Sequence, residues 1–75
     1  MKNNLFEKVR VDSTAISTAS YLKDTNTLRL VFQNGAKYDY KNVPDHVYEG
    51  LRLSDSKGSF LNKYIIKSFN FDYVN

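Results

Sequence analysis

The segment from Thr27 to Lys41, TLRLVFQNGAKYDYK, decides the fold of this chain. Its first half, TLRLVFQ, alternates large apolar side chains with other residues, which is typical of a strand with one buried side. The dipeptide Asn34-Gly35 that follows is the strongest short-range signal for a β-hairpin. The second half, AKYDYK, is therefore expected to return as an antiparallel strand beside the first.

The number of residues in the hairpin loop decides where the two tyrosines point. A two-residue loop would set charged residues opposite the apolar side chains and would leave Tyr38 and Tyr40 beside Arg29 on the other face. Exposed aromatic rings next to an arginine are the chemistry of a stacking platform for nucleic-acid bases. The loop length therefore bears on function as well as on fold.

A three-residue loop, Gln33 to Gly35 with Gly35 left-handed in a bulge, moves the register by one residue. It pairs Leu28 with Tyr40, Arg29 with Asp39, and Leu30 with Tyr38. Because this register produces one apolar face and one charged face, the sequence favours it over the two-residue loop. Tyr38 and Tyr40 are then expected to be structural residues, like Asn34, Gly35 and Pro44.

The flanking segments predict an α+β fold, with a small antiparallel sheet of three to four strands and two short helices packed on one face. A strand is expected over 15–22. A four-residue turn over 23–26 would follow it and set Tyr21, Ala19 and Ser17 beside Leu28, Leu30 and Phe32. Residues 69–73 alternate as a closing strand. We expect residues 1–10 to be an N-terminal extension, ending in a short extended segment, and residues 11–75 to form a single domain.

Two short helices are expected between these strands. Pro44 suits the first position of a helix that ends at Leu53, because the missing N–H of proline is not needed there. Ser56 suits the N-cap of a second helix. The apolar face of that helix would carry Phe60, Leu61, Tyr64 and Ile65.

The composition excludes several classes of protein. A chain of 75 residues without cysteine has room for one small core and for no disulfide or thiolate metal site. No apolar run is long enough for a signal peptide or a membrane span, so a cytoplasmic location is expected. His46 is the only histidine, and no nucleophile–base pair or metal-ligand motif surrounds it. We therefore expect no catalysis, no metal and no cofactor.

The charge permits a polyanionic partner, because the formal net charge is +3 from 11 Lys and Arg against 8 Asp and Glu. The cations are spread along the sequence, which is more typical of a solvated surface than of a basic patch. The favoured register places Arg29, Lys37 and Lys41 on the open face of the sheet, the face without helices. That face is the first candidate binding surface.

A second candidate surrounds the start of the second helix. Free backbone N–H groups and positive charge there could receive a phosphate, and the residues concerned are Ser56, Lys57, Gly58 and Lys63. A capped helix with a closely packed glycine explains the same residues without a ligand. That structural explanation is favoured, because the second glycine of a phosphate-binding loop is missing.

Several motifs in this order resemble the KTSC domain, a small domain found at the C-terminus of some lysyl-tRNA synthetases and alone in bacteria and phages. They are Val11-Asp12-Ser13-Thr14, Phe32-Gln33-Asn34-Gly35, Tyr38-Asp39-Tyr40, Asn42-Val43-Pro44 and Ser56-Lys57-Gly58. The resemblance covers about residues 11–73. Leu53-Ser54 departs from it, because a small residue is expected just before the Ser-Lys-Gly turn.

The resemblance implies a small non-catalytic binding module with RNA or another nucleic acid as its partner. The alternative is a protein-interaction module, a bacterial or phage accessory factor that docks on a protein or self-associates. Its motivation is the mixed open face and an exposed edge at the closing strand. The two hypotheses differ in how binding responds to salt, because only phosphate contacts release counterions.

Overall fold

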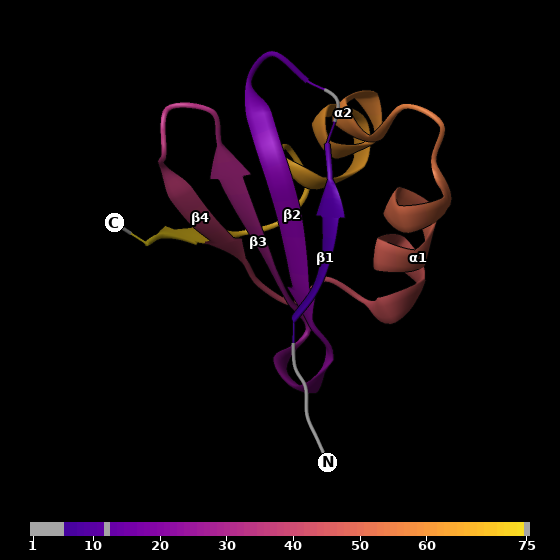
Figure 1. The fold of residues 1–75 in the computed structure, drawn as a ribbon. Helices are drawn as coiled ribbons and strands as arrows, with labels where there is room; N and C mark the ends of the chain where they lie inside the picture. Colours follow the sequence, from indigo (N-terminus) through magenta and orange to yellow (C-terminus); the bar gives the residue numbers. More distant parts are fainter. Residues whose placement is uncertain (1–5, 12, 75) are drawn as a thin grey trace.

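A five-stranded antiparallel sheet forms one layer of the molecule, and helices form the other (Figure 1). The computed structural model describes residues 6–11 and 13–74. The strands follow the order β1-β2-β3-β4-β5, so each strand lies beside its neighbours in the chain. Their bounds are Phe6–Arg10, Ile16–Leu22, Thr27–Phe32, Lys37–Tyr40 and Phe71–Tyr73. The α+β prediction is confirmed, with one strand more than the three to four expected.

The central hairpin adopts the three-residue loop that the sequence favours. The backbone N–H of Phe32 donates to the carbonyl of Ala36 at 2.8 Å, and that of Gly35 donates to the carbonyl of Phe32 at 2.9 Å. Gly35 has a φ of 92°, in the region that glycine adopts without steric cost. The register pairs Leu28 with Tyr40, Arg29 with Asp39, and Leu30 with Tyr38. The expected direction of both tyrosines, toward the helices, is confirmed.

The turn between β2 and β3 is also as expected near its closed end, where Tyr21 pairs with Leu28 and Ala19 with Leu30. Asn26 closes this turn in the left-handed conformation, with a φ of 51°. The expected pairing of Ser17 with Phe32 is wrong, because the register shifts between Ile16 and Thr18 and places Ile16 opposite Phe32. This bulge turns Ile16 into the core, where it is 2% exposed.

The strand β1 lies within the segment expected to be an N-terminal extension. All five of its residues pair with β2, from Phe6 with Leu22 to Arg10 with Thr18. The extended segment expected near Val9 is therefore longer than predicted and forms one edge of the sheet. Residues 1–5 lie outside the described part of the chain.

The helix α1, Asp45–Leu53, begins one residue after the expected position, with Pro44 at its N-cap. A second helical segment begins as α2, Lys57–Phe60, and continues as a wider π-turn, η2, over Leu61–Ile65. An alanine Cβ at Gly50 would lie 2.9 Å from the ring of Phe60. Glycine in the middle of α1 therefore lets the second helix pack closely against the first.

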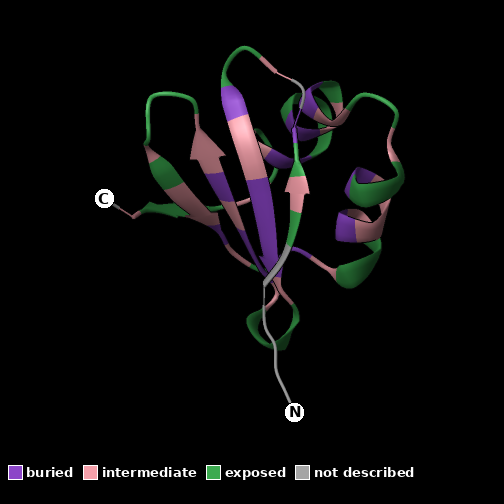
Figure 2. Cartoon of the chain, viewed as in Figure 1, coloured by how far each residue is buried: buried purple, intermediate pink, exposed green. Residues whose placement is uncertain are grey.

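The core lies between the sheet and the helices, where the buried positions of both layers face each other (Figure 2). The rings of Tyr21 on β2 and Tyr48 on α1 stack with centroids 4.5 Å apart and planes 9° apart. From the second helix, Leu61 and Ile65 are fully buried, whereas Tyr64 is 50% exposed. The predicted apolar face of that helix is therefore split between the core and the surface.

A polar cluster around the Tyr21 hydroxyl ties the sheet to the start of α1. The hydroxyl lies 2.6 Å from the carbonyl of Val43 and 2.8 Å from Oδ1 of Asp45, two acceptors for its single proton, and it accepts from Nδ2 of Asn26 at 2.8 Å. The backbone carbonyl of Asn26 also accepts from the backbone N–H of Val43 at 2.8 Å. Burial is the main reason why the pKa of Tyr21 is raised.

Candidate nucleic-acid interface

Charged and hydroxyl side chains gather on the open face, opposite the helices. Residues directly opposite each other in antiparallel strands share a face, so the register defines rows that cross the sheet. One row runs Lys8, Ser20, Arg29, Asp39, Asp72 from β1 to β5. The next row runs Arg10, Thr18, Val31, Lys37.

Positive charge exceeds negative charge on the open face. It carries five cations, the four in these rows and Lys41, against the carboxylates of Asp39 and Asp72. The chain has 11 Lys and Arg and 8 Asp and Glu. Of these, five cations and two carboxylates lie on the open face within residues 6–11 and 13–74, an excess of three positive charges. Residues scattered in the sequence are thus concentrated by the pairing of strands.

The open face is hollowed where the two rows meet. A groove of about 340 Å³ lies there, lined by Lys8, Thr18, Ser20, Arg29, Val31 and Lys37. These side chains come from four of the five strands, β1 to β4. The side chains of Lys8, Arg10 and Lys37 make no ion pair with any other side chain in 8–11 and 13–74. Their charges are therefore available to a ligand.

Arg29 is held in place by its neighbour across the hairpin. Its Nε and Nη2 donate to the two carboxylate oxygens of Asp39 at 2.7 and 3.1 Å. This bidentate contact raises the pKa of Arg29 and fixes the plane of the guanidinium at the centre of the face. Lys41 lies farther from its counter-ion, with Nζ 3.9 Å from Oδ2 of Asp72.

The second predicted set, around the start of α2, does not join the first. Ser56 occupies the N-cap position, but its side chain makes no capping hydrogen bond. Nζ of Lys57 donates to the carbonyl of Ser54 at 3.0 Å, and Gly58 is buried. Nζ of Lys63 lies 5.8 Å from the ring centroid of Tyr64. These residues belong to the helical layer, on the other side of the sheet from Arg29 and Lys37.

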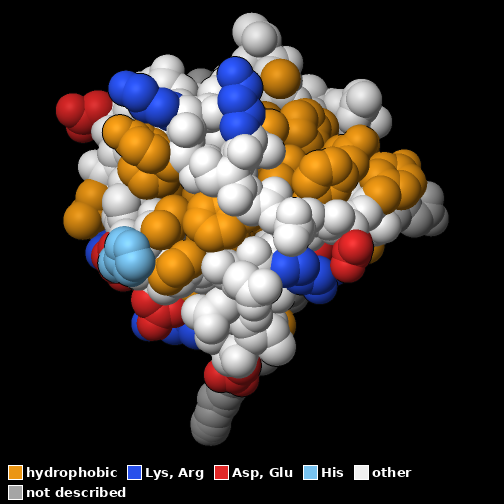
Figure 3. All heavy atoms as spheres, turned by 180° about the vertical axis from the view of Figure 1, so that it is seen from behind, with side chains coloured by type: hydrophobic (Ala, Val, Ile, Leu, Met, Phe, Trp, Pro, Cys, Tyr) orange, Lys and Arg blue, Asp and Glu red, His pale blue; other side chains and the backbone are white. Residues whose placement is uncertain are grey.

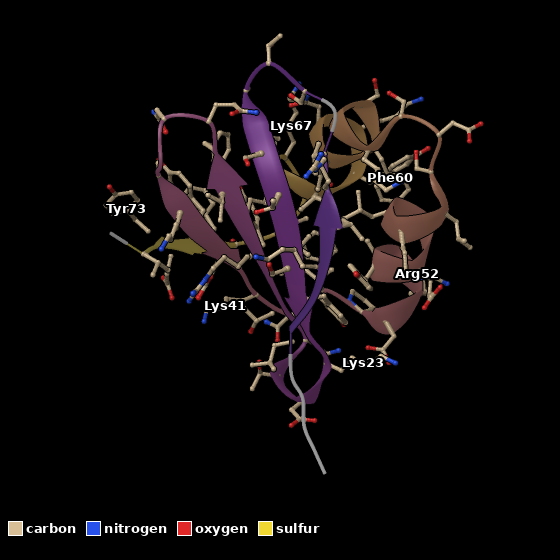
Figure 4. All side chains as sticks on the ribbon, viewed as in Figure 1. Lys23, Lys41, Arg52, Phe60, Lys67 and Tyr73 are labelled. Atoms are coloured by element: carbon tan, nitrogen blue, oxygen red, sulfur yellow. The ribbon has the colours of Figure 1, made fainter. Side chains whose placement is uncertain are left out.

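Apolar side chains gather on the helical side in two areas (Figure 3). One is a groove of about 340 Å³ between α1 and the second helix, lined by His46, Val47, Phe60, Tyr64, Ser68 and Phe69. The other lies at the β4–β5 end of the sheet, where Phe71 is 50% and Tyr73 62% exposed. Figure 4 shows Lys41 and Tyr73 at this end, and Arg52 and Phe60 among the helices.

The described residues offer no obvious place for a metal ion. Within 6–11 and 13–74, no group of three or more His, Cys, Asp or Glu side chains is arranged to hold one. In the same part of the chain, no helix is both long enough and apolar enough to cross a membrane.

Comparison with known proteins identifies the family. The model of the KTSC domain matches residues 12–69. The chain belongs to the KTSC domain family. A KTSC domain protein from Yersinia pestis has the same fold, with a TM-score of 0.81 and 25% identity over 95% of this chain and 100% of that one.

Relatives of this KTSC domain include parts of much longer proteins. A lysine–tRNA ligase of Nostoc punctiforme is 35% identical over 92% of this chain, and one of Nostoc sp. is 32% identical over the same share. The chain spans only 12% of the length of these ligases. A protein of Tsukamurella paurometabola is 37% identical over 79% of this chain and 88% of its own length. The chain is thus a small domain module of a kind that also occurs within a synthetase.

Lys8 and Arg10 are the cations of the open face that the sequence did not predict. Both lie on β1, and the polar sequence around β1 does not indicate which strand it pairs with. The alternation of Lys8 and Arg10 around the half-buried Val9 is the only local signal of their shared face.

Proposed function

We propose that this KTSC domain binds nucleic acid through the open face of its sheet. The observation that carries the proposal is the gathering of five cations against two carboxylates on one helix-free surface. Phosphate contacts supply most of the sequence-independent affinity for nucleic acids, and Lys and Arg side chains make them. The Nostoc relatives named as lysine–tRNA ligases support an RNA as the ligand.

Each residue of the face has a defined part in this proposal. Lys8, Arg10 and Lys37 neutralise phosphates, since no described carboxylate competes for them. Thr18 and Ser20 line the groove between them and offer hydroxyl donors to phosphate oxygens. Arg29 presents a guanidinium whose orientation is set by Asp39. The contacts are to the backbone of the nucleic acid, so little sequence specificity is expected.

A salt titration with matched charge variants tests the proposal. Fluorescence anisotropy with total RNA, and then with defined oligonucleotides, should show that affinity falls as salt rises. Three phosphate contacts predict a log–log slope of about −2 on a single strand, or a loss of roughly 20-fold between 50 and 200 mM salt. The double variant Lys8→Glu/Lys37→Glu should lower affinity strongly and reduce the slope by more than one.

The control changes net charge by the same amount in the helical layer. Lys63→Glu/Lys67→Glu replaces two exposed lysines there and should leave most of the affinity intact. Absence of binding at low salt contradicts the proposal. Equal losses in the two double variants would show that only net charge matters, and would remove the open face as the site.

A further inference from the structure

Aromatic rings at the β4–β5 end form one connected cluster, here called the aromatic edge, made of Phe32, Tyr38, Phe71 and Tyr73. Tyr38 lies at its centre, with ring centroids 5.5 Å from Phe32, 5.3 Å from Phe71 and 5.2 Å from Tyr73. All three contacts are edge-on, with interplanar angles between 61° and 78°. The cluster is therefore ordered by ring packing on one side and open on the other.

The rings on β5 are the exposed members of this cluster. Phe71 is 50% exposed and Tyr73 is 62% exposed, whereas Tyr40, the partner of Phe71 on β4, is 3% exposed. They face the helical side of the sheet, because Tyr38 pairs with Tyr73 and Tyr40 with Phe71. The helices cover the other end of that face (Figures 1 and 3). Large neighbouring rings that remain exposed to solvent on a small domain indicate a binding surface.

A second copy of the chain fits this edge poorly. The bonds from Lys41 N–H to Asn70 and from Val74 N–H to Lys37 show that alternate residues of β5 point toward β4. Only Phe71 and Tyr73 are left with outward N–H and C=O groups, too few for a stable strand pairing. An antiparallel pairing centred on β5 would also set Asp72, which is 75% exposed at its side chain, opposite Asp72 of the second copy.

Nucleic-acid bases fit it better, because lysines flank the carboxylates of Asp39 and Asp72 on the open side beside this edge. Lys37 and Lys41 lie on or next to β4, the neighbouring strand, and face the open side. A sugar–phosphate chain that crosses the open face and reaches this edge would carry its next bases to Phe71 and Tyr73. Stacking on exposed aromatic rings is available only to bases that are not paired within a duplex.

We infer that the nucleic acid bound by this domain is single-stranded and stacks one or two unpaired bases on Phe71 and Tyr73. This inference rests on the proposed function, since the phosphates are still held by the open face. It adds the class of ligand and a second contact surface. The rings select unpaired bases, and the lysines hold the backbone that joins them.

A single tryptophan provides the test, because the chain has none of its own. The variant Tyr73→Trp keeps a large ring at the aromatic edge and makes its fluorescence a reporter. Unstructured RNA of about ten nucleotides should quench this fluorescence, and a blunt duplex of the same sequence should not. The matched control is Tyr64→Trp, because Tyr64 is also half exposed, at 50%, but lies on the second helix. Its fluorescence should not respond to either RNA.

A second variant measures the contribution of the ring without exposing the cluster beneath it. Tyr73→Leu keeps apolar cover over Tyr38 and should lower affinity for the single strand by roughly tenfold, within the range that loss of one stacked base produces. Duplex binding should change little. The circular dichroism spectrum of each variant checks that the fold is retained.

The outcomes separate this inference from the proposed function. Equal affinity for single strand and duplex, with no quenching of the Tyr73→Trp variant, overturns the inference while leaving charge-driven binding in place. No binding of either RNA at low salt overturns both. A fluorescence change that depends on protein concentration without RNA identifies a second copy as the occupant and also overturns the inference.

Discussion

The two faces of the sheet are built from alternate residues of the same strands, yet they differ in composition and in role. On β3, Leu28 and Leu30 are fully buried against the helices, whereas Arg29 and Val31 point to the open face and line its groove. The helical side holds the domain together by apolar packing, and the open side gathers charge that the fold does not require. Stability and binding should therefore respond to different sets of substitutions.

Adjacent residues on β3 give the largest contrast. Leu30→Ala should lower the free energy of unfolding by about 2–5 kcal/mol, because it opens a cavity in the core. Val31→Ala, one residue along and half exposed, should cost less than about 1 kcal/mol. Urea unfolding followed by circular dichroism measures both. Similar losses for the two variants would show that the open face is also covered in solution.

Removal of the Tyr21 hydroxyl tests the polar cluster that ties the sheet to the start of α1. Tyr21→Phe keeps the stacking on Tyr48 but leaves the carbonyl of Val43 and the amide of Asn26 without this partner. The expected loss is about 1–3 kcal/mol, the cost of an unsatisfied buried polar group. Tyr64→Phe, at an exposed position with no hydrogen bond to the described residues, is the control and should unfold like the parent chain.

Alkaline pH should lower the stability of the domain through buried tyrosines on the helical side of the sheet. Burial raises the pKa of Tyr21 and Tyr40 above the ordinary value of 10.0. Above pH 10 the unfolded chain then loses these protons before the folded one does, so the free energy of unfolding falls as pH rises. Absorbance at 295 nm should show late-titrating tyrosines. The loss of stability above pH 10 should be smaller in Tyr40→Phe than in the parent.

The hairpin loop is expected to contribute a smaller effect. Gly35→Ala places a side chain at a φ of 92° with no other atom within 4 Å of the new Cβ, so the cost comes from the backbone alone. About 1 kcal/mol is expected in urea unfolding. Gly35→Asn should recover part of this loss, because asparagine tolerates the left-handed region better than alanine. A larger loss for asparagine than for alanine would contradict this explanation.

The smallest effect on stability is expected on the open face. Lys8→Ala and Lys37→Ala should change the free energy of unfolding by no more than about 0.5 kcal/mol, since neither lysine makes an ion pair with the described residues. The same variants should weaken RNA binding. Loss of stability in parallel with binding would mean that the two faces are not independent.

Local patterns in the sequence predicted the structural features that depend on residues close together in the chain. The hairpin register followed from Asn34-Gly35 and the alternation on either side, because a wrong register would mix charge with apolar side chains. The bulge that turns Ile16 inward could not be predicted, since no glycine or special turn residue marks it. The strand β1 and its lysine and arginine depend on pairing with a distant segment, so their contribution to the open face was also missed.

The second helix shows a different limit. Its apolar residues were predicted at helical spacing, but the π-turn at Leu61–Ile65 and the contact of Phe60 with Gly50 decide which of them are buried. Both depend on how two helices pack, which the spacing of one helix does not describe. Lys57, a member of the second predicted set, donates to the carbonyl of Ser54, a contact that helical spacing did not predict.

The order of the strands has a consequence for how the domain assembles. The first four strands form a meander joined by short connections, so each can pair with its predecessor by closing a small loop, which favours rapid folding. The fifth strand must wait until the segment 41–70, which contains both helices, has been placed. Its three residues should be the last to form and the first whose amide hydrogens exchange. The aromatic edge would then open and close while the rest of the sheet stays intact.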